Sequence, residues 1–336
     1  MNWLALDIGG ANIKAADGAG YAQSIEFPLW QQPEKLSEAL RSLLMAAPPR
    51  DRLAVTMTGE LADCFSTKAE GVAAIIAAAQ SAAGETPLSI YRSDGRLVPP
   101  AKALQSPLHV AAVNWHALAS FACRLLKSSA GMLIDIGSTT SDIIPLTKRG
   151  PVAEGICDPD RLMLGELVYT GVVRSPVCAV TGVLPWRGSP CPTAAEVFAT
   201  TADAYLILGD LPEDESATYT ADGRAMTRSF AHDRLARSIC ADRDLFDEAD
   251  ARAAADAIER AQLAKLGVAA CRVSERLGEP VETMILGGQG EFLARRLLKR
   301  LSWTADVVSL AEEFGERVSR CAPAHALAVL AREHAQ

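Results

Sequence analysis

Two acidic side chains stand near the ends of apolar strands, each just before a glycine turn. Asp7 precedes Gly9 and Gly10, and Asp135 precedes Gly137, 128 residues later (135 minus 7). Carboxylate oxygens are ligands that Mg²⁺ prefers. A lone Asp-x-Gly turn is weak evidence, because any tight hairpin has this pattern. Two copies, each opening one half of the chain, are stronger evidence. We therefore expect Asp7 and Asp135 to be catalytic residues that hold a magnesium ion. The alternative is that they only cap their turns.

Both acids are followed by groups suited to binding phosphate. Glycines allow positive φ and leave the backbone N–H groups open to an anion, and a lysine can neutralise a phosphate. A third strand passes through glycines into a helix, whose N-terminus attracts anions. The predicted phosphate-binding residues are Gly9, Gly10, Asn12, Lys14, Gly137, Ser138, Thr139, Thr140, Gly287, Gly288 and Gln289. For Lys14 the alternative is an exposed lysine on a strand.

Further polar side chains could act on a substrate. Glu60 and Asp142 are the predicted general bases, although Glu60 could instead cap the following helix and Asp142 could simply end its hairpin. Predicted substrate contacts are Asn114, Trp115, Tyr169 and Arg174. The Trp115 ring could stack on a substrate ring, and Arg174 could hold a carboxylate or a phosphate. The alternative for Asn114 and Trp115 is a pair of core helix residues, and for Tyr169 and Arg174 it is a structural role.

Composition limits the classes of partner. The chain has 336 residues, 49% of them hydrophobic, and a net charge of −8. An acidic chain without a basic face does not favour nucleic acid. No apolar run reaches membrane-spanning length and no signal peptide is visible, so we expect a cytoplasmic protein with small-molecule substrates and no membrane contact. Eight scattered cysteines read as reduced thiols. The oligomeric state is open, with a homodimer as one alternative.

Alternating and helical patterns predict an α/β protein. The length and the repeated hairpin predict two domains, 1–129 and 130–336, the second with inserted loops and helices. Predicted helices cover 33–46, 66–83, 110–127, 196–208, 248–277, 290–301 and 323–335. Predicted strands cover 4–8, 21–27, 53–58, 88–91, 132–136, 142–146, 281–286 and 305–310. The proline-rich stretch that ends at residue 192 is expected to be an irregular functional loop.

The paired hairpins and the late glycine turn resemble the actin/sugar-kinase/Hsp70 superfamily. That resemblance implies two ribonuclease-H-like domains with a ligand cleft between them. Residues 135–142, Asp-Ile-Gly-Ser-Thr-Thr-Ser-Asp, are similar to the signature of its hydantoinase/oxoprolinase branch. Segments 56–63, 112–115 and 165–171, together with Arg174, resemble a smaller branch linked to one-carbon transfer on tetrahydromethanopterin, the methanofuran-type synthases.

The resemblance implies a transferase. Such an enzyme joins an aminomethyl-furanmethanol diphosphate to the phenol of tyramine or glutamyl-tyramine and releases diphosphate, with Mg²⁺ as cofactor. A second hypothesis is an ATP-dependent small-molecule kinase or an amide-activating enzyme of the hydantoinase/oxoprolinase kind, and ATP is expected only there. A third is a non-catalytic nucleotide-sensing module. Fold alone does not decide among them.

Overall fold

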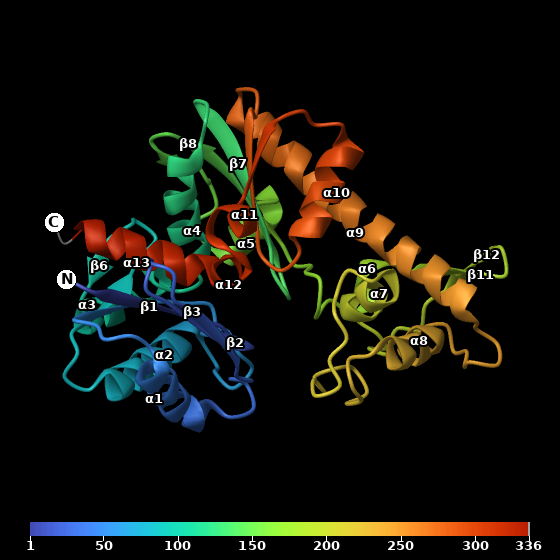
Figure 1. Cartoon of the computed structure of the whole chain (residues 1–336), viewed down its shortest axis with the longest axis horizontal. Coiled ribbons are helices and arrows are strands. Elements are labelled where there is room, and N and C mark those ends of the chain that lie inside the picture. Colours follow the sequence, from blue (N-terminus) through green and yellow to red (C-terminus); the bar gives the residue numbers. More distant parts are fainter. Residues whose placement is uncertain (335–336) are drawn as a thin grey trace.

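The computed structural model describes residues 1–334 and has two lobes, each built on one sheet (Figure 1). The N-terminal lobe has strand order β3-β2-β1-β4-β5-β6, in which β1 is antiparallel to β2 and parallel to β4. Its strands are β1 (Trp3–Ile8), β2 (Asn12–Ala16), β3 (Ala22–Glu26), β4 (Arg52–Met57), β5 (Leu88–Tyr91) and β6 (Leu97–Val98). Its helices are η1 (Pro33–Lys35), α1 (Leu36–Ala46), α2 (Lys68–Ala83), α3 (Pro100–Leu104) and η2 (Pro107–His109), followed by α4 (Asn114–Ala122) and η3 (Cys123–Leu125).

The C-terminal lobe repeats this plan with the order β10-β8-β7-β13-β14 and with β9 paired to β8. Here β7 is antiparallel to β8 and parallel to β13. The strands are β7 (Ala130–Ile136), β8 (Ser141–Thr147), β9 (Gly150–Pro151), β10 (Leu167–Val168), β13 (Thr283–Gly287) and β14 (Asp306–Ser309), with a separate hairpin of β11 (Val183–Trp186) and β12 (Ser189–Pro192). The helices are α5 (Asp158–Leu164), α6 (Val177–Val180), α7 (Thr201–Leu208), α8 (Arg228–Arg237), α9 (Glu248–Leu277), α10 (Glu291–Leu301), α11 (Leu310–Phe314), α12 (Glu316–Arg320) and α13 (Ala322–His334). The predicted α/β fold of two ribonuclease-H-like halves is confirmed.

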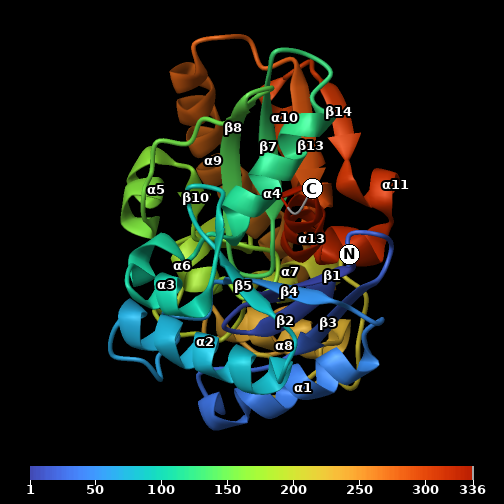
Figure 2. The ribbon, with the colours of Figure 1, turned by 90° about the vertical axis from the view of Figure 1, so that its left-hand side faces the viewer.

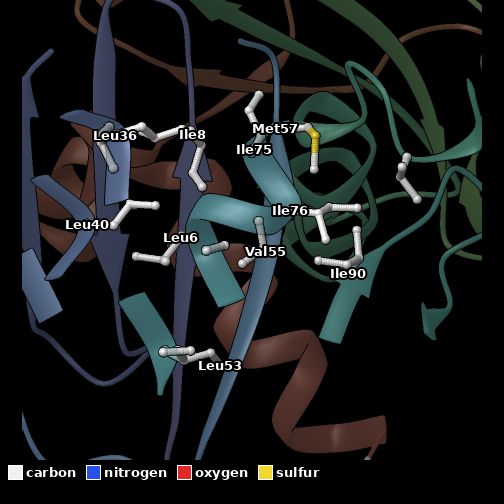
Figure 3. Close-up of a cluster of buried hydrophobic side chains, with 14 of the residues drawn as sticks. Leu6, Ile8, Leu36, Leu40, Leu53, Val55, Met57, Ile75, Ile76 and Ile90 are labelled. Carbon is white, nitrogen blue, oxygen red and sulfur yellow. The ribbon is translucent and has the colours of Figure 1, made fainter. Parts of the chain in front are cut away.

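Amphipathic helices cover the sheets. In α1 the buried residues Leu36, Leu40, Leu43 and Leu44 follow the helical period and pack against the sheet residues Leu6 and Ile8, with α2 beside them (Figure 3). The long helix α9 matches its predicted bounds because Asp247 and Asp250 form a capping box at its start and Gly278 ends it in the left-handed conformation, φ 70°.

Each lobe also receives a helix from the other half of the chain. Leu327 and Ala331 of α13 pack with Trp3 and Ala54 of the N-terminal sheet. Conversely, α4 packs on the C-terminal sheet, where Leu118 belongs to the same buried cluster as Leu133 and Ile144. Helices α4 and α13 lie side by side between the two sheets (Figures 1 and 2). This exchange ties the lobes together. The division at residues 129 and 130 stays a prediction.

Several predicted bounds were wrong. The helix expected over 110–127 begins only at Asn114, after Ala112 with φ 50°, and turns into a 3-10 helix at Cys123. The helix expected from residue 196 begins at Thr201, because Thr200 and Asp203 form a capping box there. The stretch expected to be irregular up to residue 192 contains α6 and the β11–β12 hairpin, and α5 and α8 were not predicted.

The segment 165–174 is fixed to the second glycine turn. Val172 N–H donates to Gly137 O at 3.0 Å, and Arg174 N–H donates to Ser138 O at 2.9 Å. Just before Val172, Gly171 has no room for a side chain, since an added Cβ would lie 2.5 Å from Gly137 O. Gln262 holds the Gly171 carbonyl from the core with a donated hydrogen bond of 2.8 Å. This packing presents the Arg174 side chain beside the turn.

No helix in residues 1–334 combines the length and the apolar character needed to span a bilayer. The eight cysteines in this part of the chain are free.

Gly171→Ala is expected to lower the free energy of unfolding by about 1–3 kcal/mol, because the new methyl group must displace backbone of the second turn. Urea denaturation followed by circular dichroism measures this change. Gly10→Ala is the matched control, since an added Cβ at Gly10 meets no atom within 4 Å. Equal stability of the two variants would contradict the packing described for residues 165–174.

Candidate active site

A cavity of about 620 Å³ lies between the lobes and is lined by both. Its walls come from β2 and β3, from the glycine turns after β7 and β13, from the loop between α7 and α8, and from α12 and the start of α13. Eight predicted site residues line it: Asn12, Lys14, Asp135, Gly137, Ser138, Arg174, Gly288 and Gln289. Residues up to 277 positions apart (289 minus 12) therefore share one site.

The first two glycine turns have the same construction. Gly9 N–H donates to Asn12 O at 3.0 Å, and Gly137 N–H donates to Thr140 O at 2.9 Å. Across the hairpins the register pairs Asp7 with Lys14 and Asp135 with Asp142. The two hairpins therefore match position by position. Lys14 in the first hairpin occupies the position that Asp142 has in the second. Neither Gly9 nor Gly10 uses the positive φ that glycine allows, since neither is among the residues with positive φ in residues 1–334.

The third turn does need glycine. Gly288 has φ 80°, and an added Cβ would lie 2.3 Å from Ile136 O and 2.7 Å from Asp135 Oδ1. Gly290 N–H donates to Ile136 O at 2.8 Å. The turn therefore packs directly against the strand end that carries Asp135, and helix α10 begins at Glu291, close to that carboxylate.

Asp7 is buried and Asp135 is half-buried, and both interact with one lysine. Lys14 Nζ lies 3.9 Å from Asp7 Oδ2, and Asn114 Nδ2 donates to the same oxygen at 3.4 Å. Burial raises the pKa of Asp7, while Lys14 and Asn114 oppose that rise. Burial and the charges of Asp142 and Asp7 raise the pKa of Asp135 to about 7 against the opposing effect of Lys14. Acids from the two lobes therefore interact electrostatically, although only Asp135 lines the cavity.

Buried oxygens at these acids have no partner in the described part of the chain: Asp7 Oδ1, Asp135 Oδ1 and Thr56 Oγ1. Thr56 stands beside Asp7 in the sheet register. Residues 1–334 hold no cluster of three or more His, Cys, Asp or Glu side chains placed for a metal ion. A magnesium ion needs only one or two carboxylates when waters and substrate phosphates complete its shell. The two acids fit such a site, in which the substrate supplies the other ligands.

Neither predicted base lines the cavity. Glu60 is buried beside Lys68, whose Nζ lies 3.9 Å from Glu60 Oε1, and burial raises the pKa of Glu60 to about 7. Asp142 Oδ1 accepts a hydrogen bond of 2.6 Å from Arg161, which opposes the effect of burial in raising the Asp142 pKa. Asp158 joins the two acids, since it pairs with Lys68 at 2.7 Å and with Arg161 at 3.9 Å. This chain of charges links the lobes beside the cavity.

Two predicted substrate contacts lie elsewhere. Trp115 is buried in the core between the lobes, and the guanidinium of Arg161 lies 4.1 Å from the centre of a Trp115 ring. Tyr169 is 69% exposed and is not part of the cavity wall. Asn114 does not line the cavity either, but it reaches Asp7. Turn residues Gly9, Gly10, Thr139, Thr140 and Gly287 belong to the three turns without lining the cavity.

The structure adds residues that the sequence interpretation missed. Glu26, Trp30 and Tyr219 line the cavity, as do Ser319 and Arg320 just before α13. The Ser319 hydroxyl is buried and has no hydrogen-bond partner in the described structure. No motif marks these positions. The available signal was a cluster of arginines ahead of the last helix.

Comparisons with known proteins place the chain among relatives. The hydantoinase/oxoprolinase family model matches residues 51–334. The chain is 33% identical over 330 residues to the (4-{4-[2-(gamma-L-glutamylamino)ethyl]phenoxymethyl}furan-2-yl)methanamine synthase of Methanocaldococcus jannaschii, covering 97% of this chain and 96% of that protein. It is 26% identical to the protein of the same name from Methanococcus vannielii, over 59% of this chain and 89% of that protein.

A solved structure extends the comparison to the fold. Nucleotide-free acetone carboxylase superposes with a TM-score of 0.53 at 11% identity, over 94% of this chain and 51% of that chain. At this identity the similarity concerns the fold alone. The family match covers most of the chain and the M. jannaschii relative covers nearly all of it, so the protein belongs to the hydantoinase/oxoprolinase family.

Proposed function

We propose that the protein is a transferase that forms an aryl alkyl ether. Its substrates would be an aminomethyl-furanmethanol diphosphate and the phenol of tyramine or glutamyl-tyramine, and its second product would be diphosphate. The main support is the similarity over nearly the full length to a synthase whose name contains a phenoxymethyl-furan group. The enzyme would serve the biosynthesis of a methanofuran-type carrier in one-carbon metabolism linked to tetrahydromethanopterin.

The cavity suits the departure of diphosphate. In the reaction the bond from the furfuryl carbon to a diphosphate oxygen breaks, and a bond from that carbon to the phenol oxygen forms. Lys14 and Arg320 offer positive charge, and the buried Ser319 hydroxyl offers a hydrogen-bond donor. Backbone N–H groups of the glycine turns supply further donors. Donors fixed before the reaction stabilise the charge that develops on the leaving group.

Asp7 and Asp135 would hold a magnesium ion, which would supply positive charge to the diphosphate when bound. Their unpartnered oxygens support this assignment. In its absence burial and the charge of Asp142 raise the pKa of both acids, and the charge of Asp7 further raises that of Asp135. Lys14 alone reduces this repulsion only in part.

The phenol must also lose its proton, and its reference pKa is about 10. Glu60 and Asp142 are separated from the cavity wall and are engaged by Lys68 and Arg161. We therefore propose that the departing diphosphate accepts the phenol proton as the ether bond forms. The role of the protein is then to hold the phenol oxygen within reach of both the furfuryl carbon and the departing diphosphate.

Asp135→Asn is expected to reduce kcat by at least about a thousandfold, because the variant loses a cation-holding charge in the cavity. The assay measures diphosphate released from a furfuryl diphosphate with tyramine or glutamyl-tyramine and Mg²⁺, and circular dichroism checks the fold. Full activity of the folded variant would remove the proposed role of Asp135. If the wild-type protein instead forms ADP from ATP in response to a small molecule, the ATP-dependent alternative replaces the synthase.

Glu60→Gln is expected to lower kcat less than tenfold, because Glu60 lies outside the cavity wall. The same assay measures the effect over a range of pH. A loss of a hundredfold or more, with an unchanged circular dichroism spectrum, would restore Glu60 as the general base and exclude diphosphate from that role.

Magnesium binding can be measured without turnover. Because the Asp135 pKa is raised from 3.8 to about 7, its contribution to folding stability is fully present below pH 3.8 and is lost as pH rises through 7. At pH 8 without metal, Asp135→Asn is therefore expected to melt above the wild type, and the difference should shrink toward pH 5. Millimolar MgCl₂ with diphosphate should raise the melting temperature of the wild type and not that of the variant. Equal shifts for both proteins would contradict the metal site.

A further inference from the structure

The cavity has two chemically different parts. Its deeper part contains the half-buried Asp135, whose Oδ1 atom is buried, together with Lys14 and the glycine turns. Its outer wall carries Glu26, Trp30, Arg174 and Tyr219, of which Glu26 and Arg174 are exposed and Tyr219 is 51% exposed. Under the function proposed above, diphosphate occupies the deeper part. The outer wall is then left for the phenolic acceptor.

Two aromatic rings on this outer wall come from different lobes. Trp30 follows β3 of the N-terminal lobe, and Tyr219 lies in the loop between α7 and α8 of the C-terminal lobe. Each offers a face or an edge for stacking against a phenol ring. Tyr219 lies close enough to Glu26 for the Glu26 charge to raise the Tyr219 pKa, an effect second to that of burial. The rings and the acid therefore belong to one surface.

The guanidinium of Arg174 lies against this surface. Its central carbon is 4.6 Å from the centre of a Trp30 ring. Stacking uses the flat face of a guanidinium and leaves the N–H groups along its edge available for a carboxylate. Within residues 1–334 the Arg174 side chain forms no ion pair or hydrogen bond, and its backbone is held by Ser138. A fixed and uncommitted cation therefore stands at the cavity mouth.

Glu26 places the opposite charge on the same wall. Its carboxylate and the Arg174 guanidinium influence each other electrostatically, yet among the described residues they do not form an ion pair. A carboxylate and a guanidinium that line one cavity without pairing with each other complement a ligand that carries one positive and one negative charge. A bare primary amine such as tyramine would use only Glu26 and would leave Arg174 without a partner.

We infer that the outer wall recognises the zwitterionic head of an α-amino acid carried by the phenolic acceptor. Arg174 binds the carboxylate, Glu26 binds the ammonium group, and Trp30 and Tyr219 flank the acceptor ring. A γ-glutamyl group on tyramine carries this head far from the phenol, and L-tyrosine carries it close by. The two acceptors share the chemistry and differ in length. The inference rests on the proposed function and specifies its acceptor.

The test compares kcat/KM for γ-glutamyl-tyramine, L-tyrosine and tyramine. The wild type is expected to prefer one of the two amino-acid acceptors over tyramine by at least about tenfold, the scale of one charge-assisted contact. Arg174→Gln and Glu26→Gln should each reduce that preference by about tenfold. Arg187→Gln is the matched control, because Arg187 also stacks on a tryptophan, Trp186 at 4.4 Å, on the β11–β12 hairpin outside the cavity. It should keep the wild-type preference.

Three results would overturn the inference. The wild type could use tyramine as efficiently as the amino-acid acceptors. The preference could survive in both cavity variants. Alternatively, Glu26→Gln could raise KM for the furfuryl diphosphate alone, which would show that Glu26 binds the amine of the donor substrate.

Calorimetric titration of each acceptor into the protein, without the donor, separates this inference from the proposed function. Tighter binding of an amino-acid acceptor than of tyramine, lost in Arg174→Gln, supports the outer-wall site even if no diphosphate is released. In that case the proposed reaction fails and the inferred recognition stands. Equal binding of all three acceptors overturns the inference.

Discussion

The electrostatic balance around Lys14 is the constraint on which the site depends. Two carboxylates, one from each lobe, each have a buried oxygen near this lysine, and removing a carboxylate from water is costly unless a cation or hydrogen-bond donors compensate it. Lys14 interacts with Asp7, Asp135 and Asp142. Arg161 pairs with Asp142, which leaves Lys14 as the cation beside Asp7 and Asp135, and a single cation cannot balance two acids. The residual negative charge favours a further cation and makes the cavity a metal-assisted anion site in our proposal.

Backbone packing keeps these charges in place. The third glycine turn lies against the strand end that carries Asp135, and the segment ending at Arg174 lies against the second turn. These approaches are possible only because Gly171, Gly288 and Gly290 have no side chain. Glycine therefore acts here mainly by allowing close contact, and the left-handed conformation is needed at Gly288.

The lobes are joined in two ways. Helix α4 packs on the C-terminal sheet, α13 packs on the N-terminal sheet, and the two helices contact each other, which connects the lobes. The second link is polar: it runs from Glu60 through Lys68 and Asp158 to Arg161 and Asp142. The acids predicted as bases belong to this second link. Glu60 and Asp142 are ion-paired within this link. An acidic residue close to a sequence motif can therefore connect the lobes instead of facing the substrate.

The sequence by itself determined the local parts: the repeated acidic hairpins, the third glycine turn, the two-lobed α/β plan and the long capped helix. These features follow from the spacing of apolar residues, from turn residues and from helix caps, all of which act over a few neighbouring positions. Only the tertiary structure decided which side chains share the cavity. It brought Glu26, Trp30, Tyr219, Ser319 and Arg320 to the wall and put Trp115 in the core. The physical reason is that the cavity forms where two lobes and an exchanged helix meet, and no local pattern records which side chains face one another across it.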